Sequence, residues 1–323
     1  TVSGTVQTAF DINAGELLFV SGVVSATGTL TLPADNIIAI APPVGDVQIA
    51  VGGRITGAGI ILIADGGASI SQQDGTVDVD ILALQNISGT LDPGQYDSAL
   101  VKVFAASDIN GGYTLTLPAG TFTFTGDVQF INEHATDAMT VDNSANNPNL
   151  VFRGDLEIND DAGGVFTWTK GTGTITLSGG SGTNTVDFDS ETVEDLVVNA
   201  AGVTKELTES ATVDSLTVTA GTFSQSTAGT PTLTTAGAVS VGAAGTWINN
   251  GVGDVVLGGA VSNAGIISFN SSDDANGISI TSSASPTQRN WQGAGFFHLT
   301  DVSVQDQDAT GGTPAGIYPY SST

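Results

Sequence analysis

Short runs in which apolar and polar residues alternate extend along the chain. Clear examples are residues 29–32, 76–81 and 114–117, where every second residue is Val, Ile or Leu. Alternation with a period of two places these side chains on one face of a strand. No stretch shows the 3.6-residue spacing of an amphipathic helix. The pattern therefore predicts an all-β protein.

Part of this pattern repeats between residues 165 and 269. Segments 171–179 and 251–259 share the motif G-x-G-x-[IV]-x-L-x-G, and residues 193–202 resemble residues 213–221. Ala-Gly pairs end at positions 202, 221, 245 and 265, at intervals of 19, 24 and 20 residues. Irregular repetition near 20 residues is typical of stacked parallel coils, and also of successive hairpins in tandem antiparallel β-sandwiches.

The repeat spacing gives a specific expectation for the first of these architectures. In a parallel β-solenoid each coil adds ~4.8 Å, and equivalent side chains of successive coils stack. Leu196 should then pack on Leu216, and Val198 on Val218, with glycine at the corners where φ is positive. We favour a parallel β-helix (β-solenoid). We expect a β-rich region over residues 1–149, solenoid-like repeats over 150–305 and a turn-rich tail over 306–323.

Charge excludes several kinds of partner. Six Lys and Arg residues stand against 33 Asp and Glu residues, which gives a formal net charge of −27. A nucleic-acid-binding protein needs clustered cations, so we expect no nucleic-acid partner. No apolar run approaches the ~20 residues of a membrane-spanning helix, so we expect no membrane insertion. The chain has no cysteine and therefore no disulfide.

The location of the protein is inferred from composition. A soluble, acidic, cysteine-free chain that begins at Thr1 without a signal peptide fits a processed, secreted protein. We expect it to be extracellular or at the cell surface.

The repeat segments also carry a resemblance. Residues 168–179, continued at 193–198 and 216–222, resemble repeats of large bacterial surface proteins of the parallel β-helix type. Residues 291–295 together with 299–311 show the same resemblance, which covers about residues 165–312. It implies a parallel β-helix in an extracellular setting and no particular activity.

Candidate chemistry is sparse. Asp273, Asp274, Asp306 and Asp308 are the best candidates for calcium ligands, because Ca²⁺ prefers carboxylate oxygens. They match neither an EF-hand loop nor the nonapeptide of calcium-binding β-rolls, and solvated loop acids are the simpler interpretation. Paired acids in an aromatic cleft would be needed for glycoside hydrolysis, but the three tryptophans occupy repeat positions that suit packing. We expect no enzyme, and no cofactor other than this candidate calcium.

The first functional hypothesis is a secreted structural subunit of a cell-surface or extracellular filament. Open ends of a solenoid expose strand edges, which a neighbouring copy can complete by β-augmentation. Residues 1–10 are the expected donated strand, with Thr1, Val2, Val6 and Phe10 as its assembly residues, and the tail after Gln305 is the second candidate. The alternative is a monomeric adhesin or stalk module that binds cell-surface glycans. The third hypothesis is a polysaccharide-active β-helix enzyme.

Overall fold

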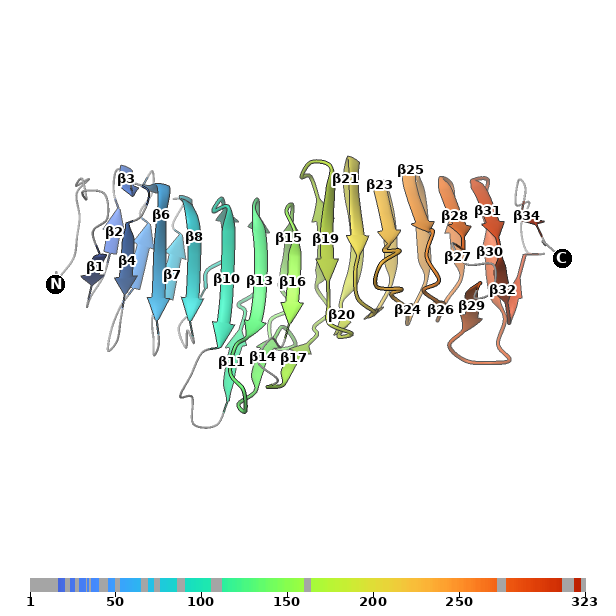
Figure 1. Ribbon diagram of the computed structural model, residues 1–323, viewed down its shortest axis with the longest axis horizontal. Helices are drawn as coiled ribbons and strands as arrows, with labels where there is room; N and C mark the ends of the chain where they lie inside the picture. Colours follow the sequence, from blue (N-terminus) through green and yellow to red (C-terminus); the bar gives the residue numbers. More distant parts are fainter. Residues whose placement is uncertain are drawn as a thin grey trace. The chain divides into compact units, whose positions relative to one another are not determined.

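The computed structural model describes residues 17–20, 24–26, 29–32, 34, 36–40, 46–49, 53–64, 69–72, 76–85, 91–105, 112–159, 164–271, 277–309 and 317–320. All regular structure in these residues is β-strand (Figure 1). None of the described segments forms a helix that would cross a membrane. The chain divides into two compact units, residues 1–171 and residues 172–323.

In the first unit the strands form three rows, and each coil of the chain contributes strands to these rows in succession. The first row contains β3 (Thr29–Leu32), β6 (Arg54–Ala64), β8 (Thr76–Gln85), β9 (Gly94–Tyr96), β12 (Thr121–Phe124) and β15 (Asn149–Phe152). The second row contains β1 (Leu17–Val20), β4 (Ile37–Ile40), the later halves of β6 and β8, β10 (Leu100–Ala105), β13 (Asp127–Asn132) and β16 (Leu156–Asn159). The third row consists of two short sheets, β2 (Val24–Ala26), β5 (Asp46–Ile49) and β7 (Ser69–Gln72), and β11 (Tyr113–Thr116), β14 (Met139–Asp142) and β17 (Phe166–Thr169).

The second unit has the same three-row plan. Its first row contains β18 (Thr174–Ser178), β21 (Asp195–Leu207), β23 (Leu216–Gln225), β25 (Val239–Asn249), β27 (Val261–Asn263), β30 (Arg289–Gln292) and β33 (Gln307–Asp308). The second row contains β19 (Thr183–Asp187), the later halves of β21, β23 and β25, β28 (Ile266–Asn270), β31 (Phe296–Thr300) and β34 (Ile317–Tyr320). The third row is a six-stranded sheet of β20 (Thr192–Val193), β22 (Ala211–Val213), β24 (Leu233–Thr235), β26 (Val255–Leu257), β29 (Ile278–Ser282) and β32 (Val302–Val304).

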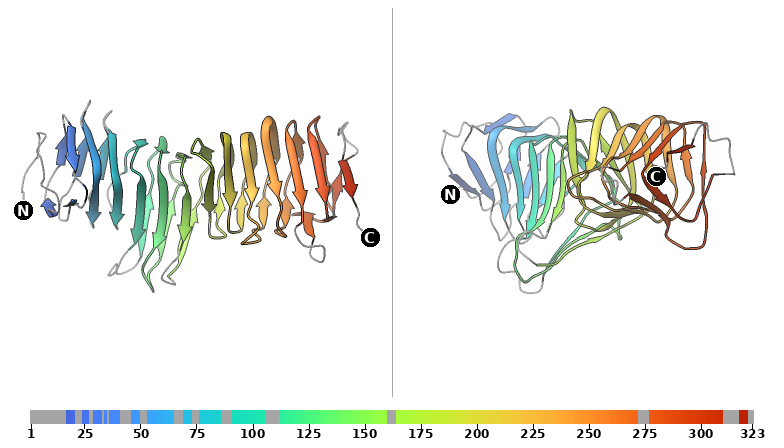
Figure 2. Two further views of the ribbon diagram at one scale, coloured as in Figure 1. Left: turned by 45° about the horizontal axis from the view of Figure 1, so that its top comes forward. Right: turned by 45° about the vertical axis from the view of Figure 1, so that its right-hand side comes forward.

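Strand direction decides between the two architectures left open by the sequence. The strand pairings described within each unit are parallel, and strands of one row lie side by side in chain order (Figures 1 and 2). Leu196 pairs with Leu216 and Val198 with Val218, which confirms the predicted register. The fold is therefore an all-β parallel solenoid, and tandem antiparallel sandwiches are excluded for the described residues.

Inward side chains of successive coils form columns in the core. In the first unit Tyr96, Phe124 and Phe152 are in register, and consecutive rings are stacked with centroids 5.3 Å apart. In the second unit the ring of Trp247 packs edge-on against Phe269, with centroids 4.8 Å apart. Trp168, Trp247 and Trp291 are 4%, 0% and 3% exposed, which confirms their packing role.

Buried amide side chains bind the backbone where coils turn. Asn263 is fully buried; its Nδ2 donates to the carbonyl of Phe296 at 2.8 Å, and its Oδ1 accepts from the N–H of Gly265 at 2.9 Å. Asn249 makes equivalent bonds to Gly253 and Gly251. These amides satisfy backbone groups that the corners remove from the sheet ladder.

Glycine at the Ala-Gly corners allows coils to approach closely. A Cβ on Gly221, whose φ is +83°, would lie 2.1 Å from the carbonyl oxygen of Ala200 in the preceding coil. Gly202 also has a positive φ, +76°, but nothing lies within 4 Å of the position of its Cβ. Gly221 is therefore constrained both by its positive φ and by the close approach of the preceding coil, whereas Gly202 is constrained by its positive φ alone.

Candidate assembly surface

In the last described coil of the second unit, β32 has a described neighbour on one side only. Within the described residues, β32 is the final strand of the six-stranded sheet and pairs only with β29. The preceding strands of that sheet each have a neighbour on both sides, apart from β20 at its other end. The edge of β32 therefore offers backbone donors and acceptors to a further parallel strand.

An apolar pocket lies beside this edge. Its volume is about 190 Å³, and it is lined by Ile280, Trp291, Leu299, Val302, Val304, Gln307 and Ala309. Most of these side chains belong to the columns that fill the core of earlier coils. Gln307 fixes the ring of Trp291, because its Oε1 accepts from the indole Nε1 at 2.7 Å. The pocket therefore continues the apolar interior of the preceding coils at the last described coil.

Large exposed hydrophobic side chains are concentrated in the same coils. Among the described residues the exposed members are Val165 at 61%, Val304 at 52%, Phe296 at 49% and Ile266 at 43%. Val304 lines the pocket, whereas Phe296 and Ile266 are paired in register on neighbouring strands β31 and β28. The ring of Phe296 also stacks on His298, with centroids 6.2 Å apart. Three of the four exposed hydrophobic residues therefore lie near the end of the second unit.

The first coil of the first unit also has strands with one described neighbour each. β1 pairs with β4, β2 with β5 and β3 with β6. Thr1, Val2, Val6 and Phe10, expected to form a donated strand, lie outside the described residues. Their role in assembly stays a prediction.

Acidic residues are dispersed over the parts of the chain that the structure describes. No three His, Asp or Glu side chains gather there as metal ligands would. Asp306 is at a turn with φ +57°, and its carbonyl accepts from the N–H of Arg289 at 2.9 Å, while Asp308 lies in β33. Asp273 and Asp274 fall outside the described residues. Calcium binding by these four residues stays a prediction.

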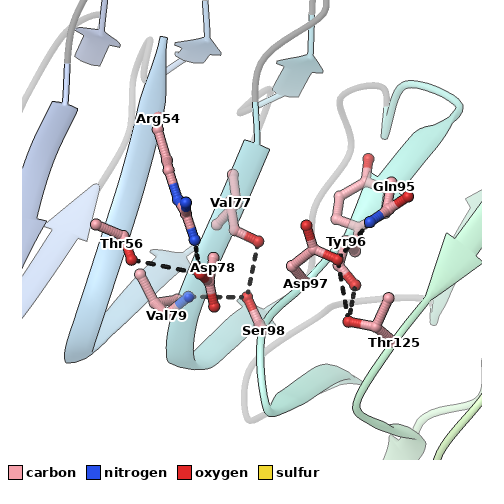
Figure 3. A network of polar contacts seen from close by, with 10 residues as sticks. All are labelled: Arg54, Thr56, Val77, Asp78, Val79, Gln95, Tyr96, Asp97, Ser98 and Thr125. Atoms are coloured by element: carbon pink, nitrogen blue, oxygen red, sulfur yellow. Dashed lines mark hydrogen bonds and ion pairs between the residues drawn. The ribbon is translucent and has the colours of Figure 1, made fainter.

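Other polar residues of the first unit link neighbouring coils rather than forming a cleft. Arg54 binds Asp78 across β6 and β8, and both side chains are exposed, at 50% and 36% (Figure 3). On the next coils, Asp97 accepts from Gln95 at 2.7 Å and from Thr125 at 3.1 Å (Figure 3). Such exposed contacts contribute about 1 kcal/mol or less each.

The two histidines occupy unrelated settings. His134 Nδ1 accepts from the backbone N–H of Asp137 at 2.8 Å, and His298 is an exposed residue of β31. The structure thus gives them different local roles and does not join them.

Sequence reasoning missed two features. It identified Val302–Val304 as a strand and Trp291 as a repeat position, but it did not predict that they meet in a pocket with Gln307. It also overlooked Lys205, which is 0% exposed. The signal was present, because Lys205 occupies the inward phase of an alternating run, between Val203 and Leu207.

Within the described residues, the parallel strand rows define a parallel β-solenoid. Comparison of the chain with protein-family models finds no matching family, and no curated protein or solved structure matches it.

Proposed function

We propose that the chain is a structural subunit that assembles with copies of itself through open strand edges. The observation that carries the proposal is the edge of β32 beside an apolar pocket of about 190 Å³. Apolar core positions and unpaired backbone groups are both costly to leave in water. A strand from a second copy satisfies both, by adding hydrogen bonds to the edge and inserting side chains into the pocket.

The donated strand in this proposal comes from residues 1–10 of the neighbouring copy, with the tail after Gln305 as the second candidate. The contact is then heterologous, since one end of a copy binds a different end of the next. Heterologous contacts that do not close into a ring produce filaments. The proposal assigns no catalysis to the chain.

The setting is also part of the proposal. The resemblance of residues 165–312 to repeats of bacterial surface proteins, and the net charge of −27, support an extracellular or cell-surface filament. A large net charge keeps the individual subunits soluble before they assemble.

The test is electron microscopy and sedimentation velocity of the purified chain and two matched variants. Val304→Asp places a charge at the exposed rim of the pocket, and Val165→Asp places one at a similarly exposed site in the first unit. The wild-type chain and Val165→Asp should form filaments, whereas Val304→Asp should remain monomeric with an unchanged circular dichroism spectrum. Deletion of residues 1–10 should also give folded monomers.

Two results would contradict parts of the proposal. Filaments of Val304→Asp that match the wild type would remove the pocket from the interface. Discrete wild-type monomers at all concentrations would contradict a structural role and favour the adhesin alternative, which a glycan-binding screen would then test.

A further inference from the structure

A lysine side chain lies in the core of the second unit. Lys205 is 0% exposed and sits on β21, with Val203 and Leu207 on the same inward face. Its register partner on β23 is Phe223, which is also fully buried. Burying an ammonium ion in such surroundings costs several kcal/mol before its partners compensate. A lysine at this position therefore needs partners or chemistry that compensate for this cost.

The amine lies against a side-chain amide of the preceding coil. Asn184 on β19 is the register partner of Lys205, and Lys205 Nζ donates to Asn184 Oδ1 at 3.0 Å. Figure 1 shows β19 and β21 side by side. The Cγ atom of Asn184 is bonded to this oxygen at ~1.2 Å, so the amine nitrogen is close to a carbonyl carbon. Holding the two groups in contact meets part of the entropic cost of bringing them together for reaction.

A buried carboxylate belongs to the same pair of coils. Glu194 is 1% exposed and lies between β20 and β21, on the segment that leads from the coil of Asn184 into the coil of Lys205. Among the described residues, Glu194 and Lys205 are the two charged residues whose side chains are buried. Glu194 is therefore the carboxylate of these two coils that we consider as the proton acceptor.

We propose that Lys205 and Asn184 form an intramolecular amide cross-link, with Glu194 transferring the proton. The Lys205 ammonium gives a proton to Glu194, and the neutral amine attacks Asn184 Cγ. The bond between Nζ and Cγ forms and the bond between Cγ and Nδ2 breaks. Glu194 passes this proton to the departing Nδ2, which also takes the second proton lost by Nζ and leaves as an ammonium ion, so the positive charge is conserved. The reaction needs no oxidant, cofactor or water.

The product suits its surroundings better than the reactants. A buried ammonium group is replaced by a neutral amide, which removes a charge from the core. The new bond ties two neighbouring coils together and closes the chain between residues 184 and 205. Closing a loop restricts the unfolded chain and so opposes unfolding. This inference concerns the interior of the second unit and is independent of the proposed assembly.

Intact mass spectrometry of the purified, folded chain tests the proposal. The wild-type mass should be lower than the sequence mass by one ammonia, about 17 Da. Proteolysis and tandem mass spectrometry should recover a branched peptide that joins Lys205 to Asn184, with no tryptic cleavage after Lys205. Wild-type protein with the full sequence mass would overturn the inference.

Three variants separate the cross-link from other losses of ammonia. Lys205→Met keeps the length of the side chain and should restore the full mass, as should Asn184→Ala. Glu194→Gln keeps the shape of the side chain but removes the proton acceptor, so cross-link formation should slow by ~100-fold. Cyclisation of Asn184 to a succinimide also releases ammonia but does not involve lysine. Loss of about 17 Da in Lys205→Met would therefore contradict the proposal.

Discussion

Alanine at Gly221 should destabilise the second unit much more than alanine at Gly202. Both glycines have a positive φ, at +83° and +76°, so either substitution incurs backbone strain of roughly 1–2 kcal/mol. Only Gly221 faces the preceding coil, where the new Cβ would lie 2.1 Å from the oxygen of Ala200 and 2.6 Å from its carbonyl carbon. Gly202→Ala therefore isolates the effect of strain.

The additional cost at Gly221 follows from the spacing of coils. Real Cβ atoms essentially never come closer than 3.0 Å to such an atom, so the backbone of Gly221 or of Ala200 must move by roughly 1 Å in a ladder whose spacing is ~4.8 Å. A displacement of that size weakens one or two backbone hydrogen bonds, each worth about 1 kcal/mol. We expect a total loss of about 2–4 kcal/mol for Gly221→Ala and about 1–2 kcal/mol for Gly202→Ala.

Urea denaturation with hydrogen-exchange mass spectrometry measures this difference. A stack of coils need not unfold in a single transition, so exchange within β23 is a better measure than one global midpoint. The β23 amides of Gly221→Ala should lose about tenfold more protection than those of Gly202→Ala, which corresponds to ~1.4 kcal/mol. Equal loss in the two variants would show that conformational strain, and not the close approach, requires glycine at this corner.

Three further predictions concern other parts of the chain. Burial, followed by a nearby carboxylate, raises the pKa of Tyr96 well above its ordinary value. Because the unfolded chain then loses this proton first, the free energy of unfolding should fall as the pH rises above about 10, and should fall less in Tyr96→Phe; identical pH profiles from urea titrations would contradict this. Asn263→Ala leaves the buried carbonyl of Phe296 and N–H of Gly265 without their side-chain partner, and calorimetry should show a loss of about 2 kcal/mol or more, whereas the exposed Asn250→Ala should show almost none. Raising NaCl from 0.01 M to 0.15 M shortens the Debye length from ~30 Å to ~8 Å, so light scattering should detect stronger self-assembly of a chain with a net charge of −27; weaker assembly would indicate ionic rather than apolar contacts.

The register of the second unit was predictable because its columns keep the same residue types. Leu196 pairs with Leu216 and Val198 with Val218, so both side chains recur at a spacing of 20 residues. Where coil length and alternation agree in this way, the sequence predicts which residues are neighbours across parallel strands.

The first unit is built from the same kind of coil, but its sequence shows no comparable repeat. The column of Tyr96, Phe124 and Phe152 tolerates exchange between rings, and the loops between strands vary in length, so no fixed period survives. Residues 29–34 and 114–119 have the same sequence, TLTLPA. Nevertheless β3 lies in the first row and β11 in the third, so the two segments are not structurally equivalent.

The candidate surface depends on where the stack ends, which a local pattern does not specify. Val304 follows the same alternation as earlier strand residues, yet it is 52% exposed because no described strand of the third row follows β32. The position of Lys205 against Asn184 likewise depends on the register between coils. The alternating pattern of its strand predicts only that its side chain points inward.

One column of the second unit illustrates how such a molecule can change in size. Leu196, Leu216, Val239, Val261 and Trp291 follow one another across five successive strands of the first row, and each pairs in register with the residue before and after it. Removal of one whole rung would bring Leu196 next to Val239, a pairing of the same character as those already present. The length of the molecule is therefore nearly independent of its internal packing. Gene duplication or deletion can adjust reach in increments of ~4.8 Å without redesigning the core.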